Sequence, residues 1–136
     1  MGLIAELKDK KAELASWRQH LHQFPEAAYE EVMTSSFVAE KLESFGIEVH
    51  RGLGKTGIVG VIHGQDCGDG TPPSIGLRAD MDALPMEEQT NLAYASRHPN
   101  RMHACGHDGH TTMLLGAAEY LARHRHFKGT VYCVFQ

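Results

Sequence analysis

Four short apolar runs, rich in β-branched residues, lie between the helical patterns of this chain. This alternation restricts the possible fold class more than any other feature of the sequence. The runs predict strands over residues 47–50, 57–64, 74–80 and 129–136. Over residues 3–22, 29–45 and 108–124, apolar residues recur at spacings of three, four and seven positions. This periodicity predicts three helices with one apolar face each. Interleaved helices and strands favour an α/β layered architecture over a bundle or a sandwich.

Length and composition are those of a single globular domain. The chain has 136 residues, of which 42% are hydrophobic and 22% charged, so it is not disordered in composition, and its net charge of −4 argues against a nucleic-acid partner. No apolar run approaches the roughly 20 residues of a membrane helix, and the start mixes acids and bases where a signal peptide would be apolar. Three cysteines, at positions 67, 105 and 133, are too few for a disulfide framework and indicate a cytoplasmic location.

The segment HACGHDGH, residues 103–110, is the first candidate for chemistry. Cys105 and His107 are one residue apart, and a thiolate with an imidazole can bind Zn(II) or a similar ion. Asp108 is expected to cap the following helix, whose dipole would then favour the Cys105 thiolate. His103 and His110 fit a ligand, an outer hydrogen-bond partner or a surface residue equally well. The alternative is a buried structural cysteine beside solvated histidines.

The segment RADMDALP, residues 78–85, is the second candidate. Asp80 and Asp82 are two apart at the expected carboxyl end of a strand, so both carboxylates would point to the same side. Active sites of open α/β sheets collect at that end, where a carboxylate can bind a metal or orient a metal-ligating histidine. The alternative is an Asp-rich turn before Pro85.

Two further patterns are set aside. GLGKTG, residues 52–57, contains Gly-Lys-Thr, but Val49 stands where a phosphate-binding loop needs glycine, and a strand follows where a helix is required. It is interpreted as a hairpin turn. The pair Glu87 and Glu88 is expected on a solvated face.

Together these segments resemble the metal-dependent amidohydrolase family of hippurate hydrolase, the indoleacetyl-amino acid hydrolases and the N-acyl-amino acid deacylases. GLRADMDALP matches the family's first acidic motif, HACGHDGHTTMLLGAA its metal motif, and TGIVGVIHG its second strand. The opening pattern of the family is matched by Arg18, His22, Pro25, Glu26, Glu31 and Thr34.

The resemblance implies a fold, a reaction and a ligand set. It implies that residues 1–136 are the N-terminal portion of a mixed-sheet, helix-flanked, zinc-peptidase-like catalytic domain. Cys105 and His107 would be metal ligands and Asp82 the acidic residue that steadies the metal centre. Around them would lie Asp80, where related peptidases carry a ligating histidine, together with His103, Asp108 and His110. The family's reaction is hydrolysis of the amide of an N-acyl-amino acid through water activated by two divalent ions, Zn, Mn or Co.

The chain also departs from the family pattern. Family members continue past the last strand with Pro-Ala-Glu-Glu, which supplies a general base and a further ligand, and later segments supply more histidines and a dimer-forming domain. We therefore expect this chain to be a fragment that binds one ion weakly or none, is inactive alone and self-associates, whereas the complete enzyme would be a homodimer. The alternatives are a small metal-binding module and an interaction fragment without catalysis.

Overall fold

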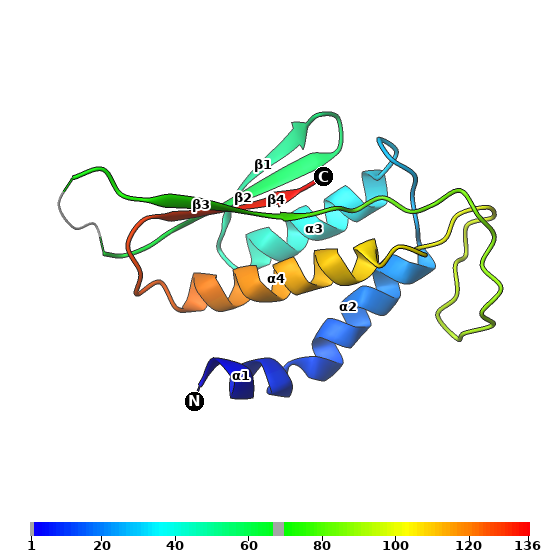
Figure 1. The fold of residues 1–136 in the computed structure, drawn as a ribbon, viewed down its shortest axis with the longest axis horizontal. Helices are drawn as coiled ribbons and strands as arrows, with labels where there is room; N and C mark the ends of the chain where they lie inside the picture. The colour runs from blue at the N-terminus through cyan, green and yellow to red at the C-terminus, as the bar shows by residue number, and fades with distance from the viewer. Residues whose placement is uncertain (1, 67–69) are drawn as a thin grey trace.

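The computed structural model describes residues 2–66 and 70–136, in which a layer of helices covers one face of a sheet (Figure 1). The helices are α1 (Leu3–Asp9), α2 (Lys11–Gln23), α3 (Val32–Ser44) and α4 (His107–Arg123). The strands are β1 (Glu48–Leu53), β2 (Gly57–His63), β3 (Ser74–Ala79) and β4 (Thr130–Phe135). The predicted α/β class is confirmed.

The sheet is mixed, with the strand order β1-β2-β4-β3. β2 pairs antiparallel with both β1 and β4, whereas β3 and β4 are parallel and are connected through α4. Ala79 of β3 lies opposite Phe135 of β4, so the residues that follow these two strands meet at one edge of the sheet. In open α/β sheets this edge, at the carboxyl ends of parallel strands, is where ligand sites form.

The core lies between the sheet and the helices, because alternate strand residues point toward the helical layer. Ile58 and Ile62 of β2 and Cys133 and Phe135 of β4 are buried in one apolar cluster with Leu42 of α3. On β4, Tyr132 points to the opposite face of the sheet and is 40% exposed. The predicted closing strand is therefore buried on one face only.

Three expected element boundaries were wrong. The helix predicted over residues 29–45 begins only at Val32, because Tyr29 has a left-handed φ of 66°. The helix predicted over residues 3–22 is interrupted at Lys10, where φ and ψ are −87° and 1°, so α1 and α2 are separate. The Lys10 ammonium group pairs there with Glu13 and with Glu119 of α4, a contact that apolar periodicity cannot reveal. The first strand was predicted over 47–50 but extends to Leu53 through the hairpin with β2. The other predicted helices and strands are present.

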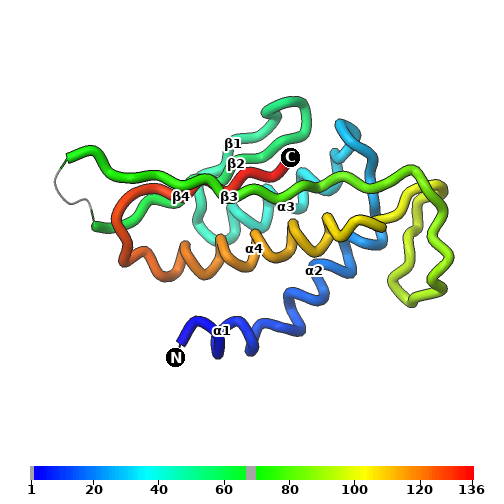
Figure 2. The backbone as a smooth tube through the Cα atoms, in the orientation of Figure 1, coloured from blue at the N-terminus to red at the C-terminus, as the bar shows by residue number. Residues whose placement is uncertain are grey.

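Between β3 and α4 the chain has no helix or strand of its own. This segment passes the end of α2 before it returns to α4 (Figure 2), and a single antiparallel bridge between Leu84 and Met102 ties it together. The exposed loop expected over residues 65–74 includes positions 67–69, so Cys67 is outside the described residues. In the described parts of the chain, no helix has the length and apolar character needed to cross a membrane.

Candidate metal centre

Asp80 and Asp82 follow β3 on an extended stretch that is fixed by its neighbours. Ala79 and Met81 are buried in the core, and alternation along the extended backbone places both carboxylates on the opposite side. The Met81 amide donates to the carbonyl of Gln136, 2.8 Å away, so this stretch is tied to the end of β4. The expected placement of the two carboxylates at the carboxyl end of a strand is confirmed.

α4 begins at His107, directly beside these carboxylates. Gly106 precedes it with a φ of 87°, a left-handed conformation that glycine adopts without steric cost. The prediction that Asp108 caps this helix was wrong, because the helix has no side-chain cap and Asp108 lies within its first turn. The Asp108 side chain is instead only 1% exposed and faces α2.

His107 and His110 both approach Asp80. Nδ1 of His110 lies 2.6 Å from Oδ1 of Asp80, and Nε2 of His107 lies 3.3 Å from Oδ2. The two rings stack with centroids 5.5 Å apart, and Thr111 donates its hydroxyl to the Asp80 carbonyl at 2.9 Å. One ligand atom from each of Asp80, His107 and His110 lies within 4.8 Å of the others. Within residues 2–66 and 70–136, no second group of three His, Cys, Asp or Glu side chains has this geometry.

Asp82 contacts the other side of the His107 ring. Nδ1 of His107 lies 2.9 Å from both Oδ1 and the backbone carbonyl of Asp82. Two acceptors at Nδ1 favour the tautomer that carries its proton there and leave Nε2 with a lone pair for a metal. A carboxylate, two imidazoles and an orienting aspartate together fit a divalent transition ion.

Asp80 at the centre and His103 near it have shifted pKa values. Partial burial raises the pKa of Asp80, but the hydrogen bond from His110 and the charge of His107 outweigh it, so the pKa is lower than usual. Burial lowers the pKa of His103 to about 4, although the nearby Asp108 carboxylate opposes this shift. The carboxylate at the centre is therefore ionised near neutral pH, as a metal ligand must be.

Four of the sequence-predicted residues lie together at the candidate centre: Asp80, Asp82, His107 and His110. The other three, Cys105, His103 and Asp108, lie outside this group. Cys105 is exposed and is not part of the three-residue group, so its role as a ligand stays a prediction. His103 and Asp108 are buried, and neither His103 ring nitrogen has a hydrogen-bond partner among the described residues.

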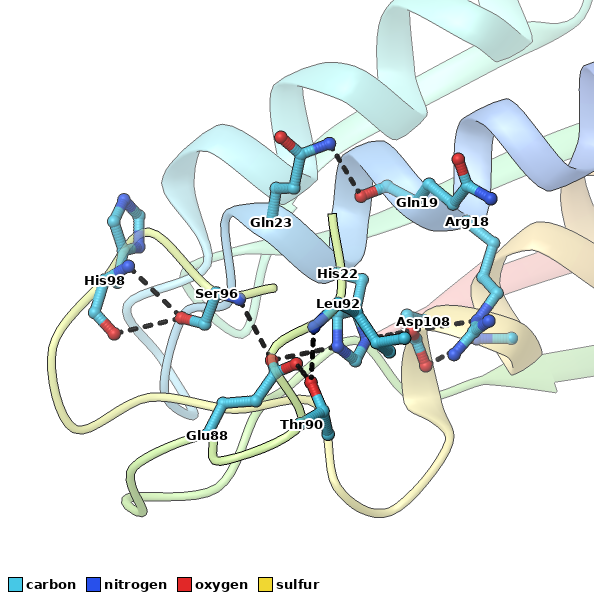
Figure 3. A network of polar contacts seen from close by, with 11 residues as sticks. Arg18, Gln19, His22, Gln23, Glu88, Thr90, Leu92, Ser96, His98 and Asp108 are labelled. Atoms are coloured by element: carbon cyan, nitrogen blue, oxygen red, sulfur yellow. Dashed lines mark hydrogen bonds and ion pairs between the residues drawn. The ribbon is translucent and has the colours of Figure 1, made fainter. Parts of the chain in front are cut away.

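Sequence reasoning assigned no role to the residues that surround Asp108. Arg18 and His22 of α2 contact its carboxylate, and Glu88 contacts the other nitrogen of His22 (Figure 3). The expectation that Glu88 lies on a solvated face was wrong, since its side chain is 3% exposed. The only available signal was the position of Arg18 and His22 in the opening pattern of the resembled family.

Comparison with known proteins shows which family this part of the chain is similar to. The family model for peptidase family M20/M25/M40 matches residues 76–136, which include β3, both aspartates, α4 and β4. Residues 76–136, called the M20 segment below, are thus similar to peptidase family M20/M25/M40. Every member of the candidate centre lies within this M20 segment, so the resemblance expected from RADMDALP and HACGHDGH is confirmed.

Similar proteins extend the match beyond the M20 segment. The chain is 49% identical to hippurate hydrolase from Campylobacter jejuni over 136 residues, which are all of this chain and 34% of that protein. It is 45% identical to N-acetyl-L-cysteine deacetylase from Bacillus subtilis, with 96% of this chain and 30% of that protein covered. The chain thus spans about a third of the length of these curated relatives.

The solved structure of the Bacillus subtilis YXEP protein, described as a dinuclear metal-binding peptidase from the M20 family, has the same fold. Its TM-score is 0.87 at 41% identity, and the match covers 95% of this chain and 36% of that chain. The metal-centre segments therefore lie in a fold that carries metal in a relative.

Proposed function

We propose that this chain is the N-terminal, metal-binding part of an M20 amidohydrolase that hydrolyses N-acyl-amino acids of the hippurate type to a carboxylate and an amino acid. The observation that carries the proposal is the geometry of His107, whose Nδ1 contacts Asp82 while its Nε2 faces Asp80 beside His110. The names of the similar proteins, hippurate hydrolase and N-acetyl-L-cysteine deacetylase, support the substrate class.

Some residues of the centre would bind the metal ion, and another would orient a metal ligand. Asp80, His107 and His110 would hold a divalent ion, Zn, Mn or Co, and Asp82 would orient the His107 ring. Cys105 is proposed as a further ligand from the family resemblance, and the complete enzyme is proposed to bind two ions. When bound, the metal supplies polarisation of the acyl carbonyl and a lowered pKa for a bound water.

A cavity beside Asp82 offers room for the substrate. Its volume is about 240 Å³, and among its lining residues are Tyr29, Arg78, Asp82 and Gln136. Tyr29 is a large apolar ring that is 66% exposed, and Arg78 carries a positive charge near Asp80, 3.6 Å from its carboxylate. An acyl-amino acid combines an apolar acyl group with a carboxylate, so such a mixed lining suits that class.

A chimera would test the proposal. The aligned third of Campylobacter jejuni hippurate hydrolase would be replaced by residues 1–136 of this chain, which match it along their full length. We expect the chimera to release glycine from hippurate in the presence of Mn(II) or Zn(II). The inserted residues 1–136 would supply the same part of the metal centre as the segment that they replace.

Two controls make the result decisive. The same chimera with His107→Ala should fold and lose activity, whereas His50→Ala, on the exposed hairpin strand β1, should keep it. A folded, metal-loaded chimera that releases no glycine would contradict the proposal. The 136-residue chain alone is expected to release none, since it spans only about a third of the length of hippurate hydrolase.

One observation also favours a metal-binding module without catalysis. The described residues provide a single three-ligand group, which is enough for one ion and not for two. A structural site binds its ion tightly, and removing the ion with a chelator unfolds the protein. In the amidohydrolase proposal the chain binds an ion weakly, and its far-UV circular dichroism is unchanged by EDTA.

A further inference from the structure

Asp108 is a buried carboxylate immediately next to the ligand candidate His107. Its side chain is 1% exposed, although it lies in the first turn of α4, where most helices present polar residues to water. A buried carboxylate is stable only when it is paired and hydrogen-bonded. Two cationic or hydrogen-bonding side chains of α2 provide this: Nδ1 of His22 at 2.8 Å and Nε of Arg18 at 3.2 Å from Oδ2.

Of these two partners, His22 is the more restrained. Its side chain is 4% exposed, whereas that of Arg18 is 42% exposed. Nε2 of His22 lies 3.0 Å from Oε1 of Glu88, and the ring packs edge-on against Tyr94 with centroids 5.6 Å apart. Each ring nitrogen thus faces a buried carboxylate from a different part of the chain.

Glu88 is itself fixed by the irregular segment between β3 and α4. It accepts hydrogen bonds from the Ser96 amide at 2.9 Å and from the Thr90 hydroxyl. Figure 3 shows the resulting line of contacts, which runs from this segment through His22 of α2 to Asp108 of α4. His22 thus contacts both the irregular segment and α4.

The first turn of α4 is therefore held on two sides. On the sheet side, Thr111 donates to the Asp80 carbonyl and His110 contacts the Asp80 carboxylate. On the opposite side, Asp108 contacts α2. A rotation of this turn would move both candidate histidine ligands relative to Asp80, and a metal site needs ligand distances within about 0.2 Å of their usual values.

We propose that His22 is a positioning residue of the metal centre: its bond to Asp108 fixes the first turn of α4, so that His107 and His110 face Asp80. This inference rests on the proposed metal centre, and it assigns to His22 no contact with metal or substrate. It predicts that metal affinity depends on the Nδ1 side of the ring, which contacts Asp108, more than on the Nε2 side.

Two amide variants of His22 separate the two sides of the ring. The amide nitrogen of asparagine lies near the place of Nδ1, and that of glutamine near the place of Nε2. His22→Asn can thus keep the bond to Asp108, whereas His22→Gln loses it and keeps a donor toward Glu88. The measurement is the affinity of the 136-residue chain for Co(II) and Zn(II), by competition with a chromogenic chelator, together with the Co(II) absorption spectrum.

We expect His22→Gln to weaken metal binding by about tenfold or more and to change the Co(II) spectrum, as substitutions around metal ligands do. His22→Asn should stay within about threefold of wild type. His124→Gln is the matched control, because His124 also pairs with a carboxylate, Glu6, but at the far end of α4. It should bind metal as the wild type does.

The outcomes distinguish this inference from the proposed function. If the wild-type chain binds no metal, the proposed centre fails and this inference fails with it. If the wild type binds metal and a folded His22→Gln chain binds equally well, only the inference is overturned. Where circular dichroism shows that His22→Gln does not fold, Asp108→Leu replaces it, since leucine is similar in size and cannot accept the bond from Nδ1 of His22. Wild-type affinity in Asp108→Leu would likewise overturn the inference.

Discussion

His107 is held through two acceptors that belong to the same residue. The carboxylate and the backbone carbonyl of Asp82 are both 2.9 Å from its Nδ1, so the ring orientation does not depend on the carboxylate alone. The carbonyl fixes the tautomer, and the carboxylate adds negative charge that strengthens Nε2 as a donor to metal. The two contributions can be separated by substitution.

Asp82→Ala is expected to weaken metal binding about tenfold, at the low end of the range for partners of metal-ligating histidines. The loss stays small because the alanine carbonyl still accepts from Nδ1. Isothermal titration with Zn(II) measures the change, and His107→Ala, which removes a ligand candidate itself, gives the reference for full loss. A tight-binding Asp82→Ala chain would show that the carboxylate contributes nothing to the centre.

The two cysteines described by the structure should react very differently. Cys105 is exposed, whereas Cys133 lies fully buried in the core, where burial raises the pKa of its thiol to about 11. Only the thiolate is nucleophilic, so Cys133 is both inaccessible and protonated. Brief treatment with iodoacetamide at pH 8, followed by peptide mass analysis, should label Cys105 and spare Cys133 until the protein is unfolded in urea.

The same pKa shift predicts a loss of stability in alkali. Because the folded pKa of Cys133 is above its ordinary value of 9.0, the unfolded chain releases this proton first as the pH rises. The free energy of unfolding should therefore fall between about pH 9 and 11, by about 2 kcal/mol in order of magnitude. Cys133→Val, similar in size and without a thiol, corrects for other titrating groups. Parallel pH profiles for the two proteins would contradict this assignment.

Residue-level prediction succeeded where chemistry was concentrated in a short segment. Asp80, Asp82, His107 and His110 could be found because each pair is close in sequence and follows a strand or begins a helix. The role of His22 could not, since its partner Asp108 is 86 positions away and Glu88 belongs to an irregular segment. Pairing across such distances is set by packing, which local patterns do not contain.

At the scale of elements, β3, α4 and β4 form the unit that assembles the centre. The two parallel strands bring residues 80–82 to the sheet edge, and the helix between them begins at the same edge with His107. The short connection from α4 to β4 packs closely against the residue that follows β2. Phe127 packs there directly over Gly64, with no space for a side chain.

Gly64→Ala should therefore destabilise the protein. A Cβ at this position would lie 2.0 Å from the carbonyl oxygen of Phe127, so the backbone must shift, at a cost of about 1–3 kcal/mol. Gly76→Ala in β3 is the control, because a Cβ there meets nothing within 4 Å and should change stability by less than about 0.5 kcal/mol. Urea denaturation followed by circular dichroism measures both. Equal stability of the two variants would show that the close approach is not strained.

The element pattern was predictable because apolar periodicity is strong in every helix and strand that faces the core. α4 and β4 were located to within one or two residues, since their apolar positions are unambiguous. The break between α1 and α2 could not be located, because no residue of α1 is buried and its apolar pattern is continuous with that of α2. The order of the strands in the sheet could not be predicted from the sequence either, because strand pairing depends on contacts between segments that are distant along the chain.

At the scale of the whole molecule, the sheet is covered on one side only (Figure 1). The helices pack on the face that carries Ile58, Ile62, Cys133 and Phe135. Alternation along β4 places Tyr132 on the opposite face, where it is 40% exposed. β3 is in addition an edge strand, whose outer backbone groups have no strand partner in the described sheet. Uncovered apolar faces and free edges both favour association.

We therefore expect the 136-residue chain to self-associate through the uncovered face of its sheet. Tyr132→Lys places a charge at the centre of that face and should shift the chain toward monomers, because burying an unpaired ammonium group in an apolar interface is unfavourable. Met113→Lys is the control: it adds the same charge at an apolar residue that is 64% exposed on α4, in the helical layer. Light scattering and sedimentation over a range of concentrations report the state of each protein. A monomeric wild-type chain would contradict the predicted self-association. If both variants dissociate equally, the uncovered sheet face is not the contact surface, and the added charge alone accounts for the dissociation.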